Sequence, residues 1–200
     1  MKKLATIALT VAAFGLAFSL AACSGGSSSS SDEDVASLVA GGSGGSAEVL
    51  SYSSDDLNNK VFSYEDEDDG TRYLGFAGGK CYKSSNSSSF PDTEREYTIV
   101  KYAGRLYKSF FMTRTSGSGL IGTFTDGENV FTFSNGGTGT ATLDGESETI
   151  SYTNNNGLVV INIPGEGDLK VYYDGNNKIY GVDEENIMTF VQNGVSVLTR

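Results

Sequence analysis

Closely spaced turns constrain the fold of this chain more than any other feature of its sequence. Between residues 126 and 175 a turn-forming pair, Asn-Gly, Asp-Gly or Pro-Gly, recurs at intervals of 8 to 12 residues. Asn and Asp followed by Gly accept the positive φ angles of tight hairpin turns at little energetic cost. Short runs of Thr, Val, Ile, Phe and Tyr fill the intervals. This pattern predicts an antiparallel meander of β-strands.

The expected strands extend over most of the chain after residue 58. They cover residues 60–64, 72–76, 96–102, 105–113, 130–133, 138–143, 149–153, 158–163, 169–173, 178–182, 187–191 and 195–198. Before them, residues 48–58 are a candidate for a short helix that covers one end of the fold.

Alternation along these strands separates an apolar face from a polar one. Phe131 and Phe133 share one side of their strand, as do Leu169, Val171 and Tyr173, while Thr, Ser, Lys and Asn occupy the other sides. One buried and one solvated face is typical of an antiparallel sheet curled round a core. So many short strands also need protected edges, which closure into a barrel provides. We therefore expect an all-β domain over residues 48–200, an antiparallel up-and-down meander that forms a closed or nearly closed β-barrel.

Residues 1–22 have the pattern of a secretory signal peptide. Lys2 and Lys3 precede an apolar run from Leu4 to Leu20, and a polar Ser/Gly stretch follows its small-residue end. The alternative is a transmembrane helix, but about 17 residues is the lower limit for spanning a bilayer. A cleaved signal therefore explains the segment better.

The signal peptide ends in Leu20-Ala21-Ala22-Cys23, which resembles the lipobox of bacterial lipoproteins. The resemblance implies that Cys23 is acylated on its sulfur and becomes the first residue of the mature protein. The next residue is Ser24. An Asp at this position would resemble the inner-membrane retention signal of enteric bacteria. We therefore expect a lipid-anchored protein of the cell envelope, in the outer membrane where the cell has two membranes. The alternative is a freely secreted protein with an incidental Cys.

Residues 23–47 are expected to form a flexible tether that carries the anchor. They are mostly Ser, Gly, Ala and acidic residues, and such a linker spans about 27 Å on average. The chain carries a net charge of −11, and loss of Lys2 and Lys3 leaves 12 basic against 25 acidic side chains, or −13. That charge disfavours binding to nucleic acid and to anionic lipid headgroups. Membrane attachment is therefore expected to come from the acyl chains on Cys23.

The lack of His and the scarcity of Cys exclude several kinds of chemistry. With no His and two Cys, the chain can form neither a Ser-His-Asp triad nor a zinc site of imidazoles or four thiolates. A hydrolase with two catalytic carboxylates is the open alternative, because glycosidases need only those. No pair of acidic residues is spaced to suggest one. We expect no catalytic residue, no metal site, no cofactor and no enzymatic activity.

Two motifs have a structural explanation that outweighs a functional one. The acidic run 65–69 could attract a hard cation such as calcium, but Phe76 stands where an EF-hand loop needs Glu. A solvated hairpin tip is therefore expected, and the acidic residues 183–185 likewise fit a turn. The spacing Gly117-x-Gly119-x-x-Gly122 matches a dinucleotide fingerprint but lies among strands, which favours a turn.

Cys81 is the only thiol left once Cys23 is acylated. Lys80 and Lys83 flank it and could lower its pKa, but the chain has no His to act as a base. A half-buried structural Cys is therefore expected, and an intermolecular disulfide is the alternative.

Residues 95–114 form the one basic and aromatic stretch of this acidic chain. Aromatic rings between cations could stack on bases or sugars. The alternative is a pair of strands joined at Ala103-Gly104, with the aromatic side chains inward and Lys101, Arg105 and Lys108 outward. We favour the pair of strands, and we regard the stretch as the first candidate for a partner surface.

Part of the meander resembles the bacterial lipocalin-like lipoproteins. The resemblance lies in the alternating strands and short polar turns of residues 131–140, 144–145, 149–152 and 157–161. It implies a barrel that holds a small apolar ligand without catalysis. The Cys-Ser-Gly tether is similar to that of surface lipoproteins whose β-barrel captures host proteins. This second resemblance implies the alternative, a surface protein whose barrel and loops bind another protein or a glycan.

Overall fold

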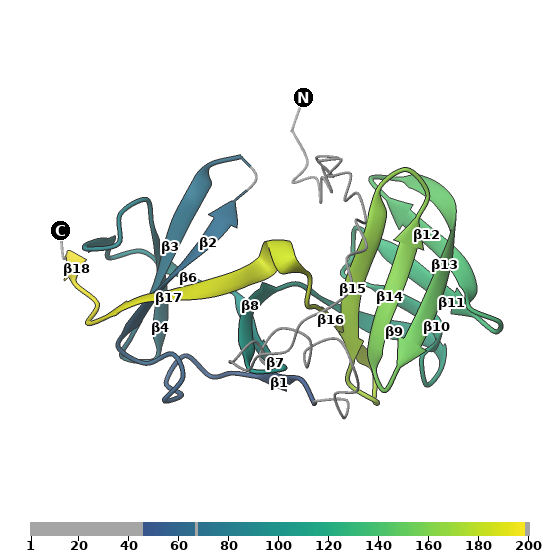
Figure 1. Ribbon diagram of the computed structural model, residues 1–200, viewed down its shortest axis with the longest axis horizontal. Coiled ribbons are helices and arrows are strands. Elements are labelled where there is room, and N and C mark those ends of the chain that lie inside the picture. Colours follow the sequence, from purple (N-terminus) through teal and green to yellow (C-terminus); the bar gives the residue numbers. More distant parts are fainter. Residues whose placement is uncertain (1–45, 67, 199–200) are drawn as a thin grey trace, which may run out of the picture.

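The computed structural model describes residues 46–66 and 68–198. The predicted signal peptide, Cys23 and nearly all of the predicted tether lie outside these residues. In the described chain the strands form a closed antiparallel barrel, a curled sheet and one further pair of short strands. The predicted all-β fold with a closed antiparallel barrel is therefore confirmed. Figure 1 shows the curled sheet and the barrel side by side along the long axis of the molecule.

The barrel is an up-and-down meander that closes on itself. Its strands are β9 (Phe111–Ser118), β10 (Ile121–Thr125), β11 (Val130–Ser134), β12 (Thr138–Leu143), β13 (Glu146–Asn155), β14 (Leu158–Ile163), β15 (Gly167–Tyr173) and β16 (Lys178–Gly181). Each strand pairs with the next one along the chain, and β16 returns to pair with β9 through Tyr180 and Phe111. Closure leaves no barrel strand with an unpaired edge.

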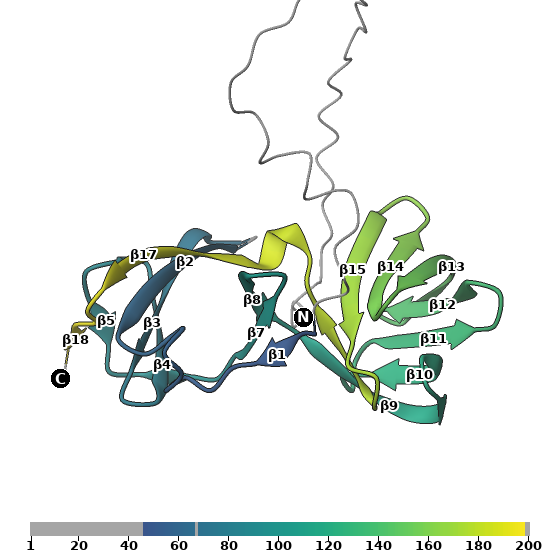
Figure 2. The ribbon, with the colours of Figure 1, turned by 60° about the horizontal axis from the view of Figure 1, so that its bottom comes forward.

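The curled sheet uses strands from both sides of the barrel in sequence. In spatial order they are β1 (Glu48–Val49), β7 (Thr98–Tyr102), β8 (Arg105–Ser109), β17 (Ile187–Asn193), β2 (Lys60–Asp66), β3 (Gly70–Ala77), β4 (Lys80–Ser84) and β6 (Glu94–Arg95). Figure 2 shows these strands bending round a common interior. The short strands β5 (Phe90–Pro91) and β18 (Val197–Leu198) pair with each other in parallel.

Tyr52 bonds the backbone that connects β6 to β7 in the curled sheet. Only Glu96 and Tyr97 separate β6, the last strand in spatial order, from β7, the second. The hydroxyl of Tyr52 donates to the carbonyl oxygen of Tyr97 and accepts from its N–H, both at 2.6 Å. The side chain thus satisfies backbone groups that no neighbouring strand pairs. Burial raises the pKa of Tyr52, so its hydroxyl keeps the proton that it donates.

The barrel is inserted between two neighbouring strands of the curled sheet. β8 and β17 pair antiparallel, with Ile187 opposite Tyr107, although the whole barrel separates them in sequence. The barrel therefore takes residues 111–181 of the expected domain 48–200, and the curled sheet takes the strands on either side. Alternation alone does not reveal this division, because a strand shows the same period whichever sheet it joins.

Most expected strands are confirmed within a few residues, but the expected strand 105–113 is interrupted. It breaks at Phe110 into β8 and β9, which belong to different units. The structure also adds β4 and β10 and the two-residue strands β1, β5 and β6, which were not expected. The glycine-spaced motif lies at the β9–β10 hairpin, as a turn. A Cβ on Gly117 would lie 2.2 Å from the carbonyl oxygen of Ile121, so only glycine fits this close approach.

The short helix expected over residues 48–58 is absent from the described chain, and that prediction is wrong. Glu48 and Val49 pair with β7 instead, and turns follow. The ammonium group of Lys60 donates to the carbonyl oxygens of Asp55 and Asp56. These carbonyls would otherwise accept from later N–H groups of a helix.

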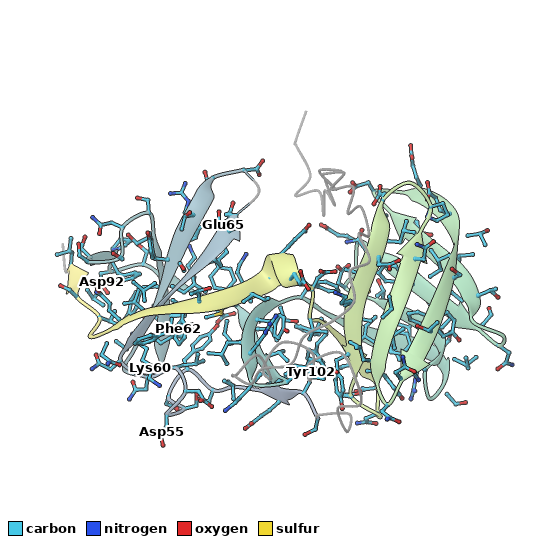
Figure 3. All side chains as sticks on the ribbon, viewed as in Figure 1. Asp55, Lys60, Phe62, Glu65, Asp92 and Tyr102 are labelled. Atoms are coloured by element: carbon cyan, nitrogen blue, oxygen red, sulfur yellow. The ribbon has the colours of Figure 1, made fainter. Side chains whose placement is uncertain are left out.

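Apolar side chains join the two units. Val100 and Tyr107 of the curled sheet pack in one buried cluster with Tyr180 of the barrel. Tyr102, labelled between the units in Figure 3, has its ring centre 5.2 Å from that of Tyr172 on β15. The aromatic residues of β7 and β8 therefore hold the barrel against the sheet.

The chain crosses from the curled sheet to the barrel at Phe110. The buried hydroxyl of Ser109 lies 2.8 Å from the carbonyl oxygen of Gly181, and the N–H of Gly181 donates to the carbonyl of Phe110 at 3.0 Å. The Phe110 ring lies over Gly181, where a Cβ would come within 2.4 Å of a ring carbon. The two chain crossings are therefore fixed to each other at this point.

We predict that Gly181→Ala destabilises the protein, because the added methyl group displaces the Phe110 ring from a packed site. Overpacking of this kind lowers the free energy of unfolding by about 1 to 3 kcal/mol. Urea denaturation measures the loss. In the double variant Phe110→Ala, Gly181→Ala the clash is gone, so the loss should be smaller than the sum of the two single losses. Additive losses would contradict the contact.

Candidate binding site

The interior of the barrel is filled by its own side chains. Phe124, Phe131 and Phe133 are each no more than 1% exposed and belong to one buried cluster. The ring centres of Phe124 and Phe133 lie 5.7 Å apart, and those of Phe133 and Tyr152 lie 4.9 Å apart, both edge to face. An eight-stranded barrel has an interior just wide enough for side chains to fill. The predicted inward face of these strands is confirmed, and their aromatic rings pack against one another inside the barrel.

The interior of the curled sheet is apolar at one end. Phe62, labelled in Figure 3, packs edge to face on Phe76 with ring centres 5.9 Å apart. Leu50 and Leu57, from the turns before β2, are buried in the same cluster. This end of the sheet is therefore closed by the segment that was expected to be helical.

Basic side chains lie on the same face of the curled sheet, beside the apolar cluster. On β3 and β4, Arg72 and Lys83 each lie two residues from a buried member of the apolar cluster, Leu74 and Cys81 respectively. Residues two apart in a strand share a face. Arg95 of β6 stands opposite Cys81. Three neighbouring strands thus place one cation each on this face.

These cations line an open cleft of about 330 Å³, which we call the basic cleft. Its lining residues are Arg72, Lys83, Ser84, Ser85, Pro91 and Arg95. The volume lies at the lower end of the range of small-molecule sites. A small ligand, or one group of a larger ligand, would fit.

Two carboxylates at the hairpin between β2 and β3 pair with cations of the cleft. Asp66 accepts from the Lys83 ammonium at 2.9 Å, and Asp69 pairs with the Arg72 guanidinium at 2.8 Å. Arg95 hydrogen-bonds only the carbonyl oxygen of its neighbour Glu94, and no carboxylate in the described chain pairs with it. The basic cleft therefore keeps a positive charge that its own carboxylates do not neutralise.

Asp66 is held in its charged form. Burial by itself would raise its pKa, but the hydrogen bond and positive charge of Lys83, together with the charge of Lys108, lower the pKa below its usual value. Burial raises the pKa of Tyr64 far above its usual value, and Tyr97 and Asp66 raise it further. The Tyr64 hydroxyl therefore stays protonated and donates to Asp66 at 3.3 Å.

The structure distributes the basic and aromatic stretch 95–114 over three places. The strand pair joined at Ala103-Gly104 is confirmed, and both turn residues have positive φ, 48° and 76°. Lys108 was expected to point outward, but its ammonium group lies over the Tyr64 ring, 4.5 Å from the ring centre. Arg95 lines the basic cleft. Tyr102 and Tyr107 pack at the junction between the two units.

Two residues of the basic cleft were not singled out from the sequence. Arg72 and Lys83 stand in ordinary alternating strands, and Lys83 drew notice only as a neighbour of Cys81. Their spacing of two residues from the apolar positions Leu74 and Cys81 is the one sequence feature that indicates a shared face with the core. Only the pairing of β3, β4 and β6 reveals that they meet Arg95.

Cys81 is buried and 1% exposed. Burial raises the pKa of its thiol to about 12, so the thiolate that a nucleophile requires is not formed near neutral pH. The flanking cations are engaged elsewhere, since Lys80 pairs with Glu94 and Lys83 with Asp66. These contacts support a structural Cys.

The predicted acidic hairpin tip is the turn between β2 and β3. Glu65 accepts a hydrogen bond from Thr71 across the hairpin at 2.9 Å, while Asp66 and Asp69 pair with cations. Within residues 46–66 and 68–198 no group of three His, Cys, Asp or Glu side chains could hold a metal ion. The second acidic run forms a turn of 3-10 helix, η2 (Glu184–Asn186), which Asp183 caps.

No protein-family model, no curated protein and no solved structure matches this chain. In the part of the chain that the structure describes, no helix has the length and apolar character to cross a membrane. The basic cleft, with its charge and its place on the curled sheet, is therefore the feature from which a function can be inferred.

We predict that Lys83→Met raises the pKa of Asp66. In the native protein this pKa is lower than in the unfolded chain, so Asp66 contributes stability above the ordinary Asp pKa, about 3.9, and loses it as the pH falls through the native value. Because Asp66 then lacks its charged partner, the free energy of unfolding of Lys83→Met should be lower than that of wild type by about 1 to 3 kcal/mol at neutral pH. NMR titration of the Asp66 carboxyl carbon and urea denaturation measure the two effects.

Lys80→Met is the matched control, because it removes the same charge from the same strand but breaks only the exposed pair with Glu94. The pKa of Asp66 should not change in this variant. An equal titration of Asp66 in wild type and Lys83→Met would contradict the assigned partner.

Proposed function

We propose that this chain is a lipid-anchored binding protein of the bacterial cell envelope, without enzymatic activity, and that the basic cleft is its binding site. The anchor is Cys23, held in the outer membrane where the cell has two membranes. The observation that carries the proposal is the cleft itself, an open recess lined by three cations in a protein with a mature net charge of −13.

The packing of the barrel favours the basic cleft over the barrel interior as the site. A small apolar ligand inside the barrel would have to displace buried rings such as Phe124 and Phe131, and interiors packed at native density resist such changes. The curled sheet needs no rearrangement to admit a ligand, because its cleft is already open. The contrast between the packed barrel and the open cleft supports binding, in the basic cleft, of a group that comes from solution or belongs to another component of the envelope.

The state of the ionisable groups near the cleft supports binding rather than catalysis. Asp66 has a lowered pKa, so it does not serve as a general acid near neutral pH. The phenol of Tyr64 and the thiol of Cys81 both have raised pKa values and remain protonated. The Tyr64 and Cys81 side chains are therefore not ionised for attack on a substrate, and the Asp66 carboxylate is already paired with Lys83.

The start of the described chain suits a tether that ends at the junction. Ala47 packs beside the buried cluster between the two units, and Glu48 opposite Lys101 begins β1. A linker of the length of residues 23–47 spans about 27 Å. The curled sheet would thus stay within reach of the membrane, while the negative charge of the protein limits its adhesion to anionic headgroups.

We predict that Cys23→Ala releases the protein from the membrane, because acyl chains on that sulfur supply the attachment. Fractionation of cells that express the full-length chain, followed by immunoblotting, measures the distribution. Cys81→Ala is the matched control, since it removes the other thiol and should leave the protein in the membrane fraction. An unchanged membrane fraction for Cys23→Ala would contradict the anchor.

We also predict that the native protein retains a ligand or partner in its basic cleft. Native mass spectrometry of the full-length lipoprotein, extracted from its own cells in mild detergent, should show a bound species beyond the acyl chains. Arg72→Gln combined with Arg95→Ala should lose that species. Arg105→Ala, which removes a cation from the exposed β7–β8 turn, should keep it. A species retained equally by all variants, or none in wild type, would contradict the proposed site.

A further inference from the structure

We infer that Asn135 is a site of spontaneous covalent modification, at which the side-chain amide is lost and an aspartyl or isoaspartyl residue takes its place. Asn followed by Gly is the pair most prone to this reaction, because Gly has no side chain to hinder attack by its own nitrogen. The chain contains three such pairs, at residues 135–136, 156–157 and 193–194. The inference is independent of the proposed function, since none of these pairs lines the basic cleft.

The reaction needs only the protein and water. The backbone nitrogen of Gly136 loses its proton and attacks Cγ of Asn135. The new C–N bond closes a succinimide ring, and the side-chain nitrogen leaves with that proton as ammonia. Water then adds to one ring carbonyl and breaks its bond to the nitrogen. Opening at Cγ restores the backbone and gives Asp, whereas opening at the backbone carbonyl gives isoaspartate, in which the chain runs through Cγ.

Two of the three pairs are held against this attack by a hydrogen bond. The Gly157 N–H donates to Oδ1 of Asn154 at 3.0 Å, and the Gly194 N–H donates to the carbonyl oxygen of Asn59 at 2.7 Å. Such a bond opposes both loss of the proton and rotation of the peptide toward the side chain. The glycine nitrogens of these two pairs are therefore poor nucleophiles.

The backbone around these two pairs is also fixed. Asn156 has a φ of 52°. In this left-handed region ψ is about +30 to +60°, which turns the next nitrogen to the side of the Cα–C bond opposite Cβ. Asn193 ends β17, where it pairs with Lys60 of β2. Ring closure at either pair would first have to break structure.

The pair Asn135-Gly136 has neither restraint. Both residues are exposed at the turn between β11 and β12. Within the described residues neither the Gly136 N–H nor the Asn135 side chain makes a hydrogen bond. A Cβ placed on Gly136 would meet no atom within 4 Å, so the peptide has room to rotate.

The hairpin allows this rotation without unfolding. Tyr152 holds both flanks of the turn, because its N–H donates to the carbonyl of Gly137 at 2.8 Å and its hydroxyl to the carbonyl of Ser134 at 2.7 Å. Gly136 has a φ of 86°, which matches the third residue of a type II turn. Type I and type II turns differ by rotation of their central peptide. That peptide, between Asn135 and Gly136, is the one that must turn.

Incubation of the complete mature chain with Cys23→Ala, at mildly alkaline pH, tests the inference. Peptide mapping by mass spectrometry follows the mass gained when OH replaces NH₂, and chromatography separates the Asp and isoaspartate products. Asn135 should convert about two- to tenfold faster than Asn156 or Asn193, the rate factor that corresponds to one hydrogen bond. Conversion of either other site at an equal or higher rate, or none at Asn135, would overturn the inference.

The same incubation in urea separates structure from sequence. Once the chain is unfolded, the three pairs should convert at similar rates, because their hydrogen bonds and turn conformations are lost. If Asn135 kept its full lead in urea, the folded turn would not be the cause and the inference would fail.

Asn154→Ala tests the protecting hydrogen bond directly. Loss of the acceptor frees the Gly157 N–H, so conversion of Asn156 should accelerate by about two- to tenfold while that of Asn135 stays the same. Asn154→Asp is the matched control, because it keeps an acceptor oxygen and should leave both rates as in wild type. An unchanged rate at Asn156 in Asn154→Ala would refute the protection on which the choice of Asn135 rests.

Discussion

The backbone pairing of β8 with β17 is the constraint on which the rest of the structure depends. These strands are neighbours in the curled sheet, yet the whole barrel lies between them in sequence. The arrangement is possible because the barrel closes through its own first and last strands, with Tyr180 opposite Phe111. Its two ends therefore emerge together, at the separation of paired strands. Each unit completes its hydrogen bonds without distorting the other.

The curled sheet carries an apolar cluster and the cations of the basic cleft on one face. At one end Phe62, Phe76 and the residues before β2 form a buried apolar cluster, which holds the strands in register. The same face also carries Arg72, Lys83 and Arg95, each opposite a member of that cluster. The three cations thus stand on paired strands, where side-chain positions are better defined than on loops.

Local chemistry made the strands predictable but left their partners hidden. The Ala103-Gly104 turn and the inward face of Phe131 and Phe133 follow from rules that act over a few residues. The break at Phe110 does not, because it depends on which sheet each half joins. The basic cleft was hidden for a related reason: Arg72 looks like an ordinary residue of an alternating strand and Lys83 lay in no expected strand, and only the pairing of β3, β4 and β6 brings them near Arg95. The helix expected over residues 48–58 does not form, and the Lys60 ammonium group bonds the carbonyl oxygens of Asp55 and Asp56 there. Periodicity does not reveal such a contact.

Closure of the barrel by β9 and β16 also limits how this protein can change in length. A meander with an even number of strands returns to the rim from which it started, whereas an odd number would end at the opposite rim. Insertion between β8 and β17 therefore imposes a rule of parity. Whole hairpins can be gained or lost from the barrel without moving either connection, but a single strand cannot. Gain or loss of a whole hairpin would therefore leave the curled sheet and its cleft in place, whereas gain or loss of a single strand would disrupt them.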